Sequence, residues 1–65
     1  MSAVRAYNLE KGSIFASGYG TDYFMVCSNP EYIGDGEIKC KVRFESENEV
    51  SEYLLGFDDI VYVID

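Results

Sequence analysis

The side chains of this chain that could do chemistry are mostly carboxylates, and their spacing does not assemble a catalytic set. Asp58 and Asp59 are adjacent, and consecutive side chains of a strand point to opposite faces, so they make a poor acid–base pair. Cys27 and Cys40 have no histidine to activate a thiolate, because the sequence contains none. The glycines match neither a phosphate-binding loop nor a dinucleotide-binding fingerprint. We therefore expect no enzymatic activity.

The same residues argue against a cofactor or a metal. Two cysteines without histidine cannot complete a structural zinc site of four protein ligands, and no spacing of the acids resembles a calcium loop. We expect Cys27 and Cys40 to be reduced and to pack as small apolar residues. The alternative is a cross-strand disulfide, which requires their Cα atoms to lie within about 7 Å.

The strongest polar motif places glutamates at every second position from Glu45 through Glu47 to Glu49. In an extended chain these carboxylates would lie on one face, about 6.6 Å apart, and would repel one another. No basic residue follows to relieve the repulsion. The motif is therefore either the polar tip of a loop between two strands or a row of charge that a basic cleft recognises.

The acidic excess is local. The chain has 65 residues, 12 acids and 5 bases, for a net charge of −7. Residues 1–43 carry five acids and five bases, so the whole excess lies in residues 44–65, which also contain many apolar side chains. This predicts a folded acidic surface, serving either solubility or recognition of a basic protein. It argues against direct contact with a nucleic-acid backbone, which needs lysine and arginine.

Tyrosine is the most abundant aromatic residue, with 6 copies against 4 phenylalanines. Tyr19 and Tyr32 fall in glycine-rich segments expected to be loops, where an exposed ring can contact a partner. Together with the acids of the C-terminal third, they complete the predicted partner-binding set: Tyr19, Tyr32, Glu45, Glu47, Glu49, Glu52, Asp58 and Asp59.

The sequence predicts that strands position these residues. Apolar and charged residues alternate over residues 36–45, which predicts a strand with one buried and one charged face. Residues 22–28 are rich in strand-forming residues, and Asp35-Gly36 favours a hairpin turn. These two segments are expected to form an antiparallel pair joined by a loop.

Three more strands are predicted, at residues 13–17, 49–55 and 60–64. The apolar spacing within residues 49–55 also fits one face of a helix, and the meander of neighbouring strands favours the strand. Residues 56–59 are expected to form a turn or a single 3₁₀ turn, and residues 1–9 an N-terminal arm or irregular lead-in.

Five short strands are too few for two packed sheets but can curl into a small barrel that leaves few exposed edges. Residues 10–15, 36–44 and 56–64 resemble the entry strand, the long middle strand and the closing turn and strand of the SH3-like small-barrel superfold. The resemblance implies an all-β, five-stranded antiparallel barrel as a single domain over residues 1–65. Peptide-binding SH3 domains use a tryptophan and a proline that this chain does not have at those places, so no activity is carried over.

These features predict a non-catalytic protein-interaction module, a small regulator or inhibitor that binds a basic protein through its acidic C-terminal surface and loop tyrosines. One alternative is an acidic nucleic-acid mimic of the phage type that blocks a DNA- or RNA-binding enzyme. Another is a structural or self-associating subunit. Direct nucleic-acid binding by a stripe of Lys39, Lys41 and Arg43 is a further alternative, which the net charge opposes.

The chain has no apolar run approaching the roughly 18 residues of a membrane span. Its first residues do not have the apolar core of a signal peptide. We therefore expect a cytoplasmic protein with no membrane partner.

Overall fold

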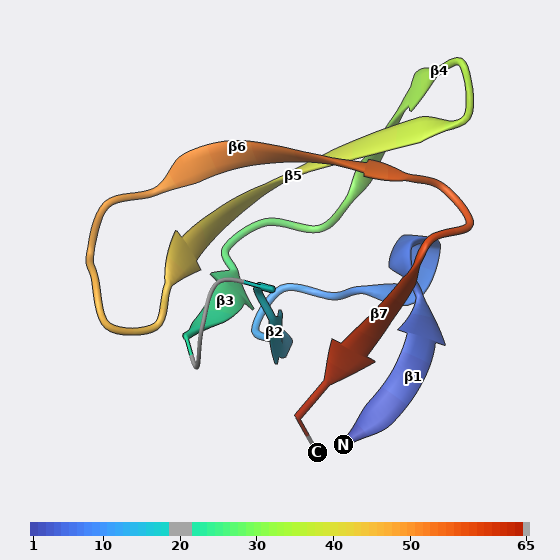
Figure 1. Ribbon diagram of the computed structural model, residues 1–65. Helices are drawn as coiled ribbons and strands as arrows, with labels where there is room; N and C mark the ends of the chain where they lie inside the picture. The colour runs from blue at the N-terminus through green and yellow to red at the C-terminus, as the bar shows by residue number, and fades with distance from the viewer. Residues whose placement is uncertain (19–21, 65) are drawn as a thin grey trace.

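The structure is a computed structural model that describes residues 1–18 and 22–64, and its regular elements are all β apart from one short 3₁₀ turn (Figure 1). The strands are β1 Ser2–Arg5, β2 Ile14–Ala16, β3 Tyr23–Val26, β4 Glu31–Gly34, β5 Glu37–Phe44, β6 Ser51–Gly56 and β7 Ile60–Val63. The 3₁₀ turn η1, Ala6–Asn8, follows β1 directly. None of the described residues belongs to a helix long and apolar enough to cross a membrane.

The long strand β5 organises the sheet. Its side chains alternate as predicted, with Ile38, Cys40 and Val42 buried and the charged residues between them on the other face. One edge of β5 pairs with β4 near its start and with β3 near its end, while the opposite edge pairs with β6. The predicted antiparallel pairing of the third and fifth strands is confirmed.

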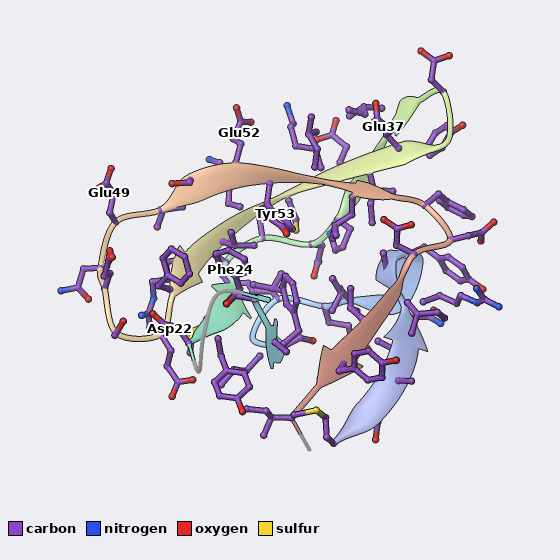
Figure 2. All side chains as sticks on the ribbon, viewed as in Figure 1. Asp22, Phe24, Glu37, Glu49, Glu52 and Tyr53 are labelled. Carbon is purple, nitrogen blue, oxygen red and sulfur yellow. The ribbon has the colours of Figure 1, made fainter. Side chains whose placement is uncertain are left out.

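The antiparallel sheet curls around one apolar core. The strand order is β1-β7-β2-β3-β5-β4, and β6 joins β5 outside this path. Phe15 of β2 nevertheless lies 6.1 Å from Tyr53 of β6, measured between ring centroids, although β3 and β5 separate their strands in the sheet. Figure 2 shows Phe24 and Tyr53 in the space that the curled sheet surrounds. The curl is not a closed barrel, since no pairing joins β6 to β1 among the described strands.

The buried cluster of the core combines side chains from most of the sheet and from the segment after η1: Leu9, Phe15, Phe24, Val26, Cys40, Val42 and Val61. These residues come from β2, β3, β5 and β7 as well as from the segment before β2. The core therefore depends on contacts between strands that are far apart in the sequence.

Two of the strands correct the sequence prediction of five. β1 lies within residues 1–9, which were expected to be irregular, and it pairs with β7 from Ser2↔Val63 to Arg5↔Ile60. β4 lies within the expected loop and pairs with β5, so Tyr32, which was expected on a loop, lies in a strand. Both strands are largely exposed and are held by backbone hydrogen bonds. Backbone pairing leaves little trace in side-chain periodicity, and the sequence pattern therefore missed both strands.

Three further local predictions are confirmed. Residues 51–56 form a strand, in which Tyr53 pairs with Cys40 and faces the core while Leu54 faces outward with 54% of its surface exposed. The Asp35-Gly36 hairpin turn has the expected left-handed backbone, with φ angles of 54° and 74°. Residues 56–59 form a turn in which the Asp59 N–H donates to the Gly56 carbonyl at 3.0 Å.

Candidate partner-binding site

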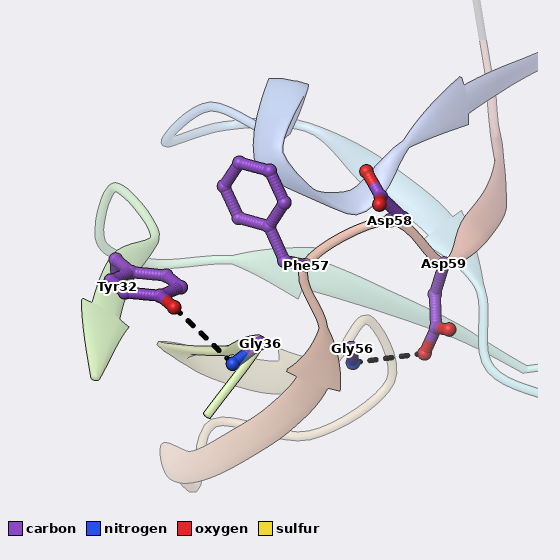
Figure 3. A pocket seen from close by; sticks show the side chains of 6 residues that line it. All are labelled: Tyr32, Gly36, Gly56, Phe57, Asp58 and Asp59. Atoms are coloured by element: carbon purple, nitrogen blue, oxygen red, sulfur yellow. Dashed lines mark hydrogen bonds between the residues drawn. The ribbon is translucent and has the colours of Figure 1, made fainter. Parts of the chain in front are cut away.

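A surface pocket lies where the β4–β5 turn meets the β6–β7 turn (Figure 3). It has a volume of about 550 Å³ and combines two aromatic rings, two glycines and two carboxylates. We call it the aromatic–acidic pocket, and its lining residues are Tyr32, Gly36, Gly56, Phe57, Asp58 and Asp59. Three of them, Tyr32, Asp58 and Asp59, belong to the partner-binding set predicted from sequence.

Backbone hydrogen bonds hold the two turns together. The Phe57 N–H donates to the Gly36 carbonyl at 2.7 Å, directly after the last β5–β6 pair, Glu37↔Gly56. The Gly36 N–H donates to the Tyr32 hydroxyl at 3.3 Å (Figure 3), which ties the tyrosine to the turn that follows its own strand. The positions of Tyr32 and Phe57 are thus set by hydrogen bonds that join two turns more than twenty residues apart in the sequence.

The β6–β7 turn is built around the Asp59 carboxylate. Its Oδ2 atom accepts a hydrogen bond from the Gly56 N–H at 2.9 Å. The carboxylate lies so close that a Cβ atom added to Gly56 would be 2.8 Å from Asp59 Oδ1. Two groups from the N-terminal segment brace the same turn, since Arg5 Nη1 donates to the Asp58 carbonyl at 3.0 Å and the Ala6 N–H donates to the Asp59 carbonyl at 2.7 Å.

Three aromatic rings form a row across this end of the molecule. The Tyr7 and Phe57 rings are stacked, with centroids 4.6 Å apart and planes 19° apart. The Tyr32 ring meets the Phe57 ring nearly at a right angle, at 84° and 5.6 Å. All three rings are partly open to solvent, with exposures of 43% for Tyr7, 37% for Phe57 and 59% for Tyr32. The row is an apolar surface bordered by acids, of the composition that interface cores favour.

Tyr7 and Phe57 are not in the partner-binding set predicted from sequence. Tyr7 lies in a segment expected to be irregular, and nothing in its neighbourhood marks it as a contact residue. Phe57 carried a usable signal, since an aromatic ring in the middle of a polar turn, between Gly56 and Asp58, has no strand face on which to be buried. Only the tertiary arrangement brings these two rings beside Tyr32.

The C-terminal acids do not form one surface. Glu45, Glu47 and Glu49 lie in the connection between β5 and β6, whereas Asp58 and Asp59 lie beyond the other end of β6 (Figures 1 and 2). Strand β6 separates the two groups by six residues, a distance of about 20 Å. The predicted acidic surface is therefore two separate acidic sites.

Glu52 lies between these two sites, and its negative charge is compensated by a lysine. Its Oε2 atom is 3.2 Å from Lys39 Nζ, across the β5–β6 pair. Lys39, one of the three cations of the hypothetical basic stripe, is therefore paired within the protein. The predicted contact residue Tyr19 lies outside the described residues.

The connection between β5 and β6, residues 45–50, is here called the acidic loop. Arg43 Nη1 donates to the carbonyl oxygens of Glu47 at 2.9 Å and of Phe44 and Glu45 at 3.3 Å each. A second contact joins the loop to the segment before β3, since Ser46 Oγ donates to Asp22 Oδ2 at 2.9 Å.

Its backbone is not the extended ladder that the motif could have formed, since residues 45–46 form a turn and the Glu47 N–H donates to the Phe44 carbonyl at 3.0 Å. The interpretation as a polar loop tip between two strands is confirmed. Arg43 acts as its internal clamp, so a second cation of the hypothetical stripe is engaged within the protein.

Both cysteines are free thiols, as expected. Cys40 is 2% exposed in the core, and Cys27 is partly buried. Burial raises the pKa of the Cys40 thiol, and the neighbouring Cys27 raises it further. Among the residues that the structure describes, no group of three or more Cys, Asp or Glu side chains is placed to hold a metal ion.

Comparisons of the chain with protein-family models, with curated proteins and with solved structures found no match. The geometry and charge of the chain itself are therefore the basis of the function proposed below.

Proposed function

We propose that this protein is a non-catalytic interaction module, a small regulator or inhibitor, that binds a basic protein partner. The observation that carries the proposal is the aromatic–acidic pocket, where exposed Tyr32 and Phe57 rings stand beside the Asp58 and Asp59 carboxylates. Exposed aromatic rings supply apolar contact area at little cost in side-chain entropy. The carboxylates supply the charge that selects a basic partner.

The charge of the whole chain supports the same proposal. A net charge of −7 on 65 residues steers a basic protein toward the molecule and speeds association at low salt. At the pocket, the described cation that contacts the β6–β7 turn is Arg5, and it binds a backbone carbonyl rather than a carboxylate. Among the described residues, no basic side chain forms an ion pair with the Asp58 or Asp59 carboxylate.

The nucleic-acid mimic is a second candidate, and the acidic loop favours it. Glu45, Glu47 and Glu49 are all exposed, and no ion pair joins them to another residue in the described ranges 1–18 and 22–64. Such a loop could enter a basic cleft that normally holds a phosphate backbone. The two candidates use opposite ends of β6 and can therefore be separated by mutation.

We propose that the curled sheet is a variant of the SH3-like small barrel, with β2, β3, β5, β6 and β7 as its five strands and β1 and β4 as additions. The contact between Phe15 of β2 and Tyr53 of β6 supports this assignment. A cytoplasmic location is proposed on the sequence features alone.

A pull-down from the native host, analysed by mass spectrometry at low and high salt, tests the two candidates. The baits are the wild type, Tyr32→Ala/Asp58→Asn at the pocket, and Glu45→Gln/Glu47→Gln/Glu49→Gln at the acidic loop, each with its fold checked by circular dichroism. Support for the proposal is a basic protein that the wild type and the loop variant retain, that salt releases, and that the pocket variant loses by tenfold or more.

Other outcomes overturn it. Loss of capture only in the loop variant, together with competition by DNA or RNA, establishes the mimic instead. Recovery of the bait alone, with self-association in sedimentation, establishes the self-associating subunit. Asp59 is left unchanged in these baits because its carboxylate holds the β6–β7 turn.

A further inference from the structure

We infer that the aromatic–acidic pocket receives an arginine side chain of the partner, with the guanidinium against an aromatic ring and its N–H groups on the Asp58 carboxylate. The inference rests on the proposed function and adds which basic group is recognised. It follows from the ring geometry, the free Asp58 carboxylate and the shape of the cation.

The rings offer a flat surface for a cation. Tyr7 stacks on Phe57, which supports the Phe57 ring in one orientation, and the Tyr32 ring stands at 84° to it on the pocket side. Tyr32 is further fixed through its hydroxyl, which accepts from the Gly36 N–H. Two rings at a right angle let a planar group that lies on the face of one ring meet the edge of the other, and a cation is attracted to a ring face.

The two carboxylates have different roles. Asp59 uses Oδ2 to accept the Gly56 N–H, so this side chain holds the turn in place. The Asp58 carboxylate makes no hydrogen bond or ion pair with any residue in the described part of the chain, although its backbone carbonyl accepts from Arg5. Figure 3 shows the two carboxylates pointing in different directions from the turn. Asp58 is therefore the acceptor left for a ligand.

The combination of a ring face and a free carboxylate selects arginine among the basic side chains. A guanidinium is planar, so it can stack on a ring while donating N–H bonds in its own plane to a carboxylate. A lysine ammonium is a compact and strongly hydrated charge that cannot stack in this way. A trimethylated lysine has no N–H to donate and would leave Asp58 without a hydrogen bond.

Titration of ¹⁵N-labelled full-length protein with blocked tripeptides tests the inference by NMR. The probes are Ac-Gly-X-Gly-NH₂ with X as arginine, citrulline, lysine or trimethyl-lysine, where citrulline is the neutral isostere of arginine. We expect the arginine peptide to shift the amides of residues 36 and 56–59 with a Kd of about 10 mM, the range for one cation on one aromatic site. Lysine should bind at least threefold more weakly, and citrulline should cause no saturable shift.

Three variants locate the contact. Asp58→Asn and Tyr32→Leu should each weaken arginine binding at least threefold, while Glu47→Gln, a matched loss of charge at the acidic loop, should leave the shifts at the pocket unchanged. The inference is overturned if citrulline, lysine or trimethyl-lysine binds as well as arginine. It is also overturned if no peptide shifts the pocket amides, or if Glu47→Gln reduces binding as much as Asp58→Asn.

This result is separable from that of the pull-down. If arginine fails here while Tyr32→Ala/Asp58→Asn still abolishes capture of a basic protein, the inference fails and the proposed function stands. If the arginine peptide binds the pocket while that variant captures the basic protein as the wild type does, the pocket recognises arginine and the proposed function fails.

Discussion

Gly56, which lines the pocket, has no Cβ atom, and this lets the Asp59 carboxylate pack against its backbone. A Cβ atom there would lie within 3.0 Å of three atoms of the Asp59 carboxylate, a separation at which the carboxylate must move. We expect Gly56→Ala to cost about 1–2 kcal/mol in the free energy of unfolding, because the Gly56 N–H then loses its acceptor. Urea denaturation of the variant and the wild type measures this cost.

The control for this prediction is a double-mutant cycle with Asp59→Ala. Without the carboxylate the added methyl group has room, so Gly56→Ala should cost less than half as much in the Asp59→Ala background. Equal costs in the two backgrounds would show that the contact between these residues has no part in the effect.

We expect Cys40 to make the stability depend on pH. Burial, and secondarily Cys27, raise its pKa in the folded chain above the value of about 8.5 for an unfolded thiol. The folded state then binds more protons than the unfolded state at alkaline pH, so stability is unaffected below about pH 8.5 and falls as the pH rises through the folded pKa.

Urea denaturation under reducing conditions at pH 7.5 and at about pH 9.5, in wild type and Cys40→Ala, checks this dependence. The alanine variant is expected to be less stable at both pH values, because it leaves a gap in the core, but to lose less stability between them. Parallel losses in the two proteins would contradict the prediction.

At the scale of elements, Arg43 links the end of β5 to the acidic loop. Its side chain donates to three backbone carbonyls of residues 44–47 and to Met25 Sδ at 3.3 Å. Arg43→Met keeps much of the apolar stem but removes the donors, so we expect a loss of about 1–2 kcal/mol. The Glu47 amide, which donates to the Phe44 carbonyl, should exchange with deuterium at least fivefold faster.

Arg5→Met is the matched control. Arg5 also donates to a backbone carbonyl, but at the β6–β7 turn, so its loss should speed exchange around Asp59 and leave the Glu47 amide as in the wild type. If both variants change the Glu47 amide equally, the effect is a global loss of stability rather than a local clamp.

At the scale of the whole molecule, stability depends on a few large core side chains. Phe15 is 2% exposed and lies against Phe24 and Tyr53. Phe15→Ala is expected to cost about 3–5 kcal/mol, while a chain of this length has a total of about 3–10 kcal/mol. The variant should therefore lose about a third or more of its free energy of unfolding and melt at a clearly lower temperature.

Thermal melts by circular dichroism check this expectation against two graded variants. Phe15→Leu should fold with a lower midpoint, and Leu54→Ala, at a position 54% exposed, should change the stability by less than about 0.5 kcal/mol. A Phe15→Ala variant as stable as Leu54→Ala would mean that the core does not hold the curled sheet together.

Residue patterns were enough to predict the all-β class, the antiparallel pairing of β3 with β5, and the hairpin turn at Asp35-Gly36. Those properties follow from local patterns, namely alternation along β5 and a dipeptide that tolerates left-handed backbone. Residue type also placed Tyr32, Asp58 and Asp59 in the predicted partner-binding set, although Tyr32 lies in strand β4 and not in the expected loop.

The folded arrangement was needed to show that β1 and β4 are strands, since both are held by backbone pairing with a partner distant in sequence or across a turn. It also divided the C-terminal acids between the two ends of β6 and brought Tyr7 and Phe57 to Tyr32. The physical reason is common to these cases. A contact between segments far apart in the chain depends on how the sheet curls, and no local pattern of residues encodes that curvature.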